Sequence, residues 1–133
     1  MTAHRIMVVD DDEDIRASLI ELIEDHGYEA VGAAHGRDAL ERLRGQEQTP
    51  CVILLDLMMP VMDGWEFRQQ QRSDPALASI PVVVISAYRH RPSVTELDAA
   101  DYLNKPVQFD NLLEVVRRHC PDAPDAASEQ PEA

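Results

Sequence analysis

Residues 51 to 64 read Cys-Val-Ile-Leu-Leu-Asp-Leu-Met-Met-Pro-Val-Met-Asp-Gly. The first five are apolar and do not alternate with polar residues, a pattern typical of a strand buried on both faces of a parallel sheet. Asp56 follows directly and places a carboxylate at the carboxyl end of this strand, where open α/β sheets bind their ligands. This stretch therefore predicts both a fold class and the location of a site.

Three other segments repeat the arrangement of a strand followed by a polar side chain. They are Ile6–Val9 before Asp10 and Asp11, Val82–Ile85 before Ser86, and Tyr102–Asn104 before Lys105. Because the carboxyl ends of parallel strands meet at one edge of a sheet, we expect these side chains to form one site.

Helix-like segments lie between the strands. Apolar residues from Ile15 recur at helical spacing up to Gly27, a helix-ending glycine. The pattern also predicts a short strand at 28–31 and helices over 37–45, from the Asp63 cap to residue 72, from Ser93, and from about residue 110 to Pro121. This order indicates an α/β fold with a parallel sheet, helices on both faces and right-handed crossovers.

The length of 133 residues, with 44% hydrophobic and 28% charged residues, predicts one globular domain over 1–120. Residues 121–133 contain three prolines, four acids and no basic residue, so we expect a disordered tail, or the start of a linker to an output domain. The sequence shows no membrane-spanning stretch or signal peptide, and we expect a cytoplasmic protein that does not bind membranes.

The net charge of −13 argues against direct nucleic-acid binding, because the chain would repel phosphate backbones, but it permits a basic protein partner. Cys51 and Cys120 lack the spacing of metal ligands, and we interpret them as reduced structural thiols. The five histidines share no ligand spacing either, and we expect them on the surface or in loops.

Hard oxygen ligands gather at the predicted edge. The carboxylates of Asp10, Asp11 and Asp56 would raise one another's pKa unless a cation intervenes, and they suit Mg²⁺, with Mn²⁺ as an alternative. Lys105 can bind a phosphoryl oxygen, Ser86 can donate to another, and the small Ala87 leaves room for the group. These parts suit an Asp56 nucleophile that forms an acyl phosphate.

An aspartate after a strand is more often a turn residue or a helix cap, so the joint pattern carries the argument. Four segments together resemble the receiver domain of bacterial two-component response regulators, of the single-domain type, over residues 5 to about 119. They are Ile6-Met-Val-Val-Asp-Asp11, Leu54-Leu-Asp-Leu-Met-Met-Pro-Val-Met-Asp-Gly64, Ile80-Pro-Val-Val-Val-Ile-Ser-Ala87 and Asp101-Tyr-Leu-Asn-Lys-Pro106.

The resemblance implies a flavodoxin-like (βα)5 three-layer sandwich with strand order 2-1-3-4-5. It implies that Asp56 is the phosphoacceptor, that Asp10, Asp11, Asp56 and the Met58 carbonyl hold Mg²⁺, and that Lys105 binds phosphate. It also makes Ser86 the switch hydroxyl, Tyr102 the switch aromatic residue, and Lys105–Pro106 a candidate cis peptide. The implied partners are a histidine kinase or histidine phosphotransfer protein, a downstream protein target, and a second copy in a phosphorylation-dependent homodimer.

Two features depart from the family pattern. Only nineteen positions separate Ser86 from Lys105, which shortens the predicted loop and fourth helix on the family's usual signalling face. Met58 and Tyr88 stand two residues beyond the acceptor and the switch residue, where we expect them to shield the phosphoryl group from water and slow its loss.

Two alternatives accompany this reading. The chain could be the receiver part of a larger hybrid kinase or transcriptional regulator, although Met1 lies just before the first strand and favours a free-standing or N-terminal receiver. The other is an aspartyl-nucleophile phosphohydrolase, but Met58 stands where such enzymes carry an acid/base aspartate, so we expect no turnover enzyme.

Overall fold

A parallel sheet forms the centre of the molecule. The computed structural model describes residues 4–45, 49–57, 61–86 and 99–120. The five strands of the sheet lie in the order β2-β1-β3-β4-β5, and all neighbouring pairs are parallel. Their bounds are β1 Arg5–Val9, β2 Glu29–Ala33, β3 Val52–Asp56, β4 Val82–Ser86 and β5 Asp101–Asn104. The predicted fold class and strand order are confirmed.

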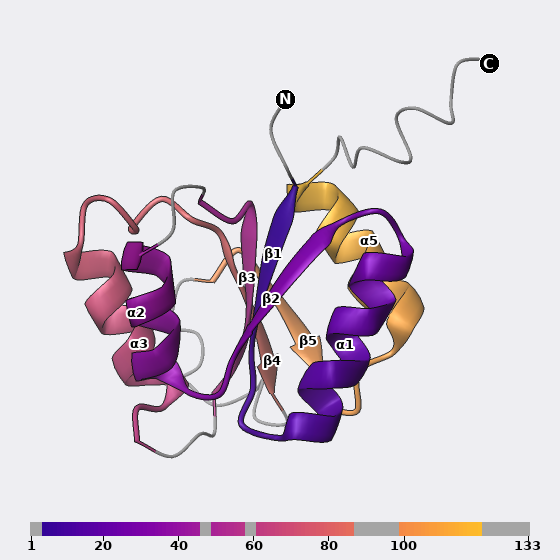
Figure 1. The fold of residues 1–133 in the computed structure, drawn as a ribbon, viewed down its shortest axis with the longest axis horizontal. Helices are drawn as coiled ribbons and strands as arrows, with labels where there is room; N and C mark the ends of the chain where they lie inside the picture. The colour runs from indigo at the N-terminus through magenta and orange to yellow at the C-terminus, as the bar shows by residue number, and fades with distance from the viewer. Residues whose placement is uncertain (1–3, 46–48, 58–60, 87–98, 121–133) are drawn as a thin grey trace.

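Helices cover both faces of this sheet, which gives three layers (Figure 1). Helices α1 (Glu13–Asp25) and α5 (Phe109–His119) lie on one face, and α2 (Gly36–Gly45) and α3 (Gly64–Ser73) lie on the other. The helix expected from Ser93 falls within 87–98, outside the described residues. No helix in the described ranges has both the length and the apolar character needed to span a bilayer.

Each strand contributes alternate side chains to two separate cores. On β3, Ile53 and Leu55 pack toward the core that contains Leu40 and Phe67 from α2 and α3. Val52 and Leu54 belong to the other core, with α1 and α5. All five residues of β3 are buried, so the uninterrupted apolar run does indicate a strand covered on both faces.

The ends of the helices follow the expected capping chemistry. The Asp12 side chain accepts hydrogen bonds from the Asp14 and Ile15 amides at the start of α1. Asp63 accepts from the Glu66 amide, at 2.9 Å, at the start of α3. Gly27 follows α1 with a φ of 94°, a conformation that glycine adopts readily. These caps fix where the loops at the edges of the sheet begin and end.

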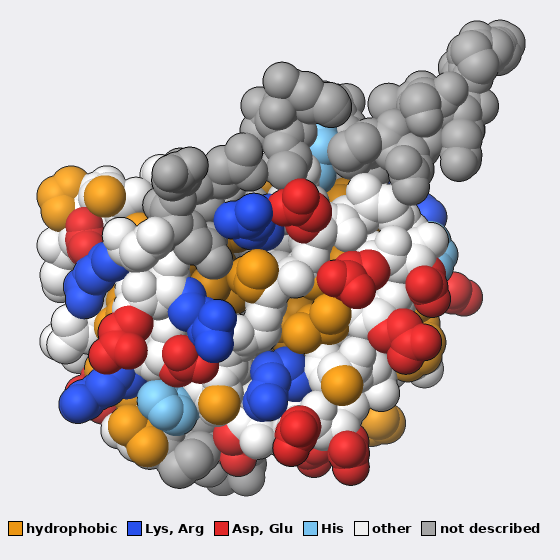
Figure 2. Space-filling model, in the orientation of Figure 1, with side chains coloured by type: hydrophobic (Ala, Val, Ile, Leu, Met, Phe, Trp, Pro, Cys, Tyr) orange, Lys and Arg blue, Asp and Glu red, His pale blue; other side chains and the backbone are white. Residues whose placement is uncertain are grey.

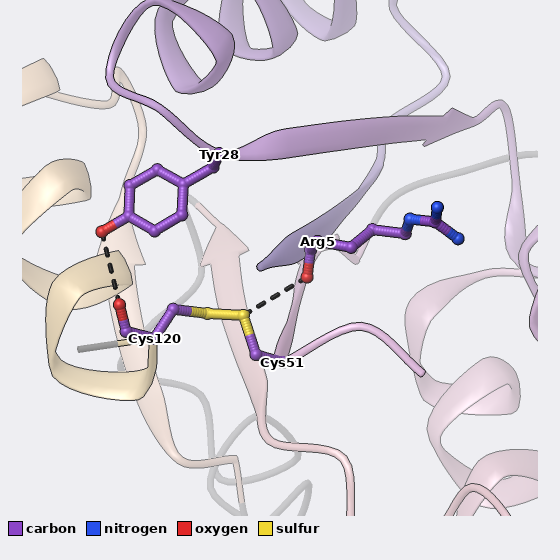
Figure 3. Close-up of a disulfide and its surroundings, with 4 residues drawn as sticks. All are labelled: Arg5, Tyr28, Cys51 and Cys120. Carbon is purple, nitrogen blue, oxygen red and sulfur yellow. Dashed lines mark hydrogen bonds between the residues drawn. A yellow bond between two sulfur atoms is a disulfide. The ribbon is translucent and has the colours of Figure 1, made fainter. Parts of the chain in front are cut away.

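The expectation of reduced cysteines is wrong for this structure, because Cys51 and Cys120 form a disulfide (Figure 3). Cys51 directly precedes β3 and Cys120 is the C-cap of α5. Their Cα atoms lie 5.8 Å apart although 69 positions separate them in sequence. The amino end of a parallel strand and the carboxyl end of a helix that packs antiparallel to the strands reach the same edge, and this topology brings the two sulfurs together.

Candidate functional site

Three carboxylates converge at the carboxyl edge of the sheet. Asp10 and Asp11 follow β1, and Asp56 ends β3, the neighbouring strand. Val9 is in register with Leu55, so Asp10 and Asp56 emerge at the same level. One ligand oxygen from each of the three residues lies within 4.8 Å of the others. The structure thus brings together the three acids that the sequence predicted.

Lys105 lies against this cluster. Its Nζ atom is 3.2 Å from Oδ1 of Asp56 and 3.8 Å from Oδ2 of Asp10. Lys105 directly follows β5, two strands away from Asp56 in the sheet. The Lys105–Pro106 peptide bond is cis, as the resemblance implied. The ammonium therefore reaches the two buried carboxylates from the far side of β4.

Burial sets the electrostatics of Asp10. Burial raises the pKa of the Asp10 carboxyl above its ordinary value, while the hydrogen bond from the Asp12 amide and the Lys105 ammonium lower it. Arg16 also donates to the Asp10 backbone carbonyl, at 2.7 Å, from the second turn of α1. Sequence reasoning missed Arg16, because its role depends on how α1 folds back over the end of β1.

Comparison of the sequence with models of protein families gives a match over most of the chain. The model of the response regulator receiver domain matches residues 6–117. The chain belongs to this family. The chain is 39% identical over 135 residues to the response regulator MprA of Mycolicibacterium vanbaalenii, covering 94% of this chain but only 54% of MprA. It thus spans about half the length of that relative.

Shorter relatives match over nearly their whole length. Protein PilH of Pseudomonas aeruginosa is 30% identical over 115 residues, which cover 84% of this chain and 93% of PilH. A crystal structure of a response regulator receiver protein from Pseudomonas putida superposes with a TM-score of 0.81 at 27% identity, covering 89% of this chain and 98% of that one. Receivers are signalling domains rather than turnover enzymes, which answers the phosphohydrolase alternative at the level of the family.

Receiver domains bind Mg²⁺ in their acidic pocket, and the described residues of this receiver fit that ion. The donor atoms are carboxylate oxygens, the hard ligands that Mg²⁺ prefers. Asp10 and Asp56 are buried whereas Asp11 is exposed, so a cation would compensate buried negative charge and still keep water on its open side. Asp10, Asp11 and Asp56 are therefore the residues that could hold the metal.

Of the remaining predicted site residues, the structure describes Tyr102 with its side chain and Ser86 by its backbone. Tyr102 is half-buried on β5, packs against the core that contains Phe67, and its hydroxyl accepts a hydrogen bond from the Ala99 amide at 3.3 Å. Ser86 ends β4, and only its backbone is described. The predictions for Met58, Ala87 and Tyr88 lie outside the described residues.

A groove of about 560 Å³ lies between α1 and the start of α5. It adjoins the acidic cluster because Lys105, which contacts Asp10 and Asp56, also lines the groove. Lys105 and Pro106 contribute to its lining, and so do Ile15 and Phe109, which remain 39% and 50% exposed. Acidic side chains gather around the first turn of α1, at the lower edge in Figure 2. The helical spacing places Ile15 with the apolar residues of α1, but the structure leaves it exposed while Leu19 and Ile23 are buried.

Proposed function

We propose that Asp56 accepts a phosphoryl group from the phosphohistidine of a histidine kinase or histidine phosphotransfer protein, and that this change alters binding to a downstream protein. The observation that carries the proposal is the position of Lys105 Nζ, 3.2 Å from an Asp56 carboxylate that also lies beside Asp10 and Asp11. Such a site offers a nucleophile, a cation for the transferred group and ligands for a metal within one cluster.

The phosphoryl transfer forms one bond to phosphorus and breaks another. A carboxylate oxygen of Asp56 forms a bond to phosphorus while the bond between phosphorus and the donor imidazole nitrogen breaks, and the imidazole keeps the electron pair. The Lys105 ammonium binds a phosphoryl oxygen and stabilises its charge during transfer. Mg²⁺, when bound by Asp10, Asp11 and Asp56, supplies additional neutralisation of that charge.

The exposed apolar surface beside the acidic cluster supports a protein donor that docks over this edge of the sheet. Asp56 is only 4% exposed, so a donor must bring its phosphoryl group close to the acidic cluster. Ile15 and Phe109 present exposed apolar surface beside this opening, where a donor domain could pack. A donor that uses this surface would align its phosphohistidine with Asp56.

Phosphorylation would change the charge balance around Lys105. The acyl phosphate adds about −1.5 to −2 charges and new acceptor oxygens at Asp56. We expect the Ser86 hydroxyl and Lys105 to turn toward these oxygens, and Tyr102 to change its packing in response. A partner that binds the altered surface more tightly, whether an effector or a second copy of the chain, would then read the signal.

Labelling of the full chain by a phosphorylated histidine phosphotransfer protein, followed by mass spectrometry, tests the acceptor assignment. We expect one phosphoryl group in the wild type with Mg²⁺, loss of labelling with a chelator, and loss in Asp56→Asn. Asp25→Asn, an exposed substitution at the last residue of α1 and at the end of that helix away from the site, should label normally and serves as the matched control. Undiminished labelling of Asp56→Asn would refute the proposal.

The lifetime of the acyl phosphate tests the proposed shielding by Met58 and Tyr88. We expect slow loss in the wild type and faster loss in Tyr88→Ala, since a smaller side chain would admit an attacking water. Decay is followed by phosphate-affinity electrophoresis after removal of the donor. Equal decay rates in the two proteins would exclude Tyr88 as a shield.

A further inference from the structure

The Cys51–Cys120 disulfide lies at the end of the sheet opposite the acidic cluster. Cys51 precedes β3, whose last residue is Asp56, and five residue steps place the two roughly 16 Å apart along the strand. Cys120 ends α5, the helix that follows Lys105 in the chain. The disulfide therefore connects β3, which carries Asp56, with α5, which follows Lys105. It lies outside the acidic cluster.

Hydrogen bonds of their backbone groups hold both cysteines independently of the covalent bond, and Figure 3 shows the one from the Tyr28 hydroxyl to the Cys120 carbonyl. The Cys51 amide donates to the Arg5 carbonyl at 2.8 Å, and the Cys120 amide donates to the Val116 carbonyl at 2.7 Å. The Tyr28 hydroxyl donates to the Cys120 carbonyl at 3.4 Å. Because these contacts do not involve the sulfur atoms, they return Cys120 to the neighbourhood of Cys51 whenever the end of α5 closes, so the bond can form again after reduction.

The surroundings of the two sulfurs differ in a way that favours exchange. Cys120 is 1% exposed within the core shared by α1 and α5, whereas Cys51 is partly exposed. The Cys51 sulfur also lies 3.3 Å from the Arg5 carbonyl, so the thiol of the reduced form has a hydrogen-bond acceptor ready. Of the two residues, Cys51 is therefore the one that a small thiol attacks, while the buried Cys120 thiol is protected from other reactions.

We propose that Cys51 and Cys120 form a reversible redox site that exchanges with low-molecular-weight thiols and disulfides and controls how firmly the end of α5 is attached to the sheet. The proposal does not depend on phosphorylation of Asp56. Leu112 and Val116 keep α5 packed in both states, since they are buried in the core. The last turn is held to the sheet by the exposed ion pair of Arg118 with Asp101 of β5 and by the disulfide, so reduction removes the stronger of these two attachments. Reduction therefore loosens the last turn and leaves the rest of the helix in place.

The exchange proceeds in two balanced steps. A glutathione thiolate attacks the Cys51 sulfur, the Cys51–Cys120 bond breaks, and the electron pair remains on the Cys120 sulfur, which then takes a proton. A second glutathione thiolate attacks the glutathione sulfur of the mixed disulfide, which forms glutathione disulfide and releases Cys51 as a thiolate that then takes the second proton. Two electrons and two protons pass to the protein, and glutathione disulfide is the oxidant in the reverse direction.

The first test equilibrates the full, folded chain with a series of glutathione and glutathione disulfide ratios, then quenches with acid, labels free thiols with a maleimide and measures intact mass. We expect two free thiols at reducing ratios, none at oxidising ratios, and a return to two when the ratio is reversed. A bond that stays intact under excess reductant until the protein unfolds, or thiols that stay free under excess glutathione disulfide, would overturn the proposal.

The second test measures amide hydrogen exchange of the oxidised and reduced wild type, without Mg²⁺ or phosphodonor. Amides of the last turn of α5 should exchange at least about tenfold faster in the reduced form, with α1 amides unchanged. Cys51→Ser should match the reduced wild type at every glutathione ratio. Equal exchange of the last turn in the two redox states would show that the bond does not control α5 and would also overturn the proposal.

Discussion

Replacement of Gly64 by alanine tests how closely the start of α3 packs against the end of β3. The Gly64 amide donates to the Leu57 carbonyl at 2.9 Å. A Cβ atom at this position would lie 2.6 Å from Leu57 Cδ2, 2.8 Å from Leu57 Cα and 3.1 Å from the Asp56 carbonyl oxygen. A side-chain methyl can turn away, but the two backbone atoms can move only if the loop that follows Asp56 moves.

The magnitude follows from two opposing terms. Overpacking of this kind costs about 1–3 kcal/mol. The gain of alanine over glycine, roughly 0.5–1 kcal/mol in the middle of a helix, applies only in part at Gly64 because it is the first residue of α3. We therefore expect a net loss of about 1–2 kcal/mol in the free energy of unfolding, and a melting temperature lower by roughly 3–10 °C for a domain of this size. Since the displaced atoms adjoin Asp56, phosphoryl transfer to the variant should also slow.

Gly45→Ala provides the matched control. Gly45 ends α2, and a Cβ atom there would meet no atom within 4 Å. Its free energy of unfolding should change by less than about 0.5 kcal/mol. Both variants are unfolded by urea and by heat under identical conditions and then labelled at a temperature at which both are folded. Equal stability and equal labelling of the two variants would refute the packing argument.

Three further predictions concern other parts of the fold. Gln71 is 0% exposed and donates to two backbone carbonyls before β4, so Gln71→Ala should cost about 2–4 kcal/mol in urea unfolding; a cost under about 1 kcal/mol would contradict this. Burial raises the pKa of the Tyr28 hydroxyl above its ordinary value, so the folded state favours the protonated hydroxyl. The stability that this preference contributes is fully present below the ordinary pKa of tyrosine, and it is lost as the pH rises through the raised pKa of the folded state. Urea unfolding of Tyr28→Phe should therefore depend less steeply on pH than that of the wild type above about pH 10, and parallel curves would exclude Tyr28 as the cause. Mg²⁺ should raise the melting temperature of the wild type through binding to the folded state and raise that of Asp11→Asn much less, whereas an equal response would remove Asp11 from the metal site.

Much of the fold can be predicted from the sequence of β3 and its neighbouring strands, because a strand buried on both faces is an unbroken run of apolar residues. A run such as Val52–Leu55 has no polar position, and this excludes an edge strand of a half-exposed sheet. The carboxyl ends of such strands must share an edge, so Asp10, Asp11, Asp56 and Lys105 could be assigned to one site before any distance was known. The strand order came from the resemblance, because the sequence pattern alone does not determine it.

The features that sequence reasoning missed depend on contacts between distant segments. Spacing rules for cysteines detect metal ligands that are close in sequence, whereas Cys51 and Cys120 are 69 positions apart and meet through topology. Helical periodicity assigns Ile15 to the apolar stripe of α1 but does not reveal that, unlike Leu19 and Ile23, it has no core to pack against and stays exposed. The hydrogen bond from Arg16 to the Asp10 carbonyl likewise depends on the angle at which α1 follows β1.

The two links between β3 and the α5 segment lie at opposite ends of the sheet. At the carboxyl end of β3, the Asp56 carboxylate pairs with Lys105, which leads into α5. At the amino end, the disulfide joins Cys51 to the last residue of the same segment. One link is an ion pair whose charge a phosphoryl group would change, and the other is a covalent bond that a thiol can break. Because the length of β3, roughly 16 Å, separates them, each link can change while the other is intact.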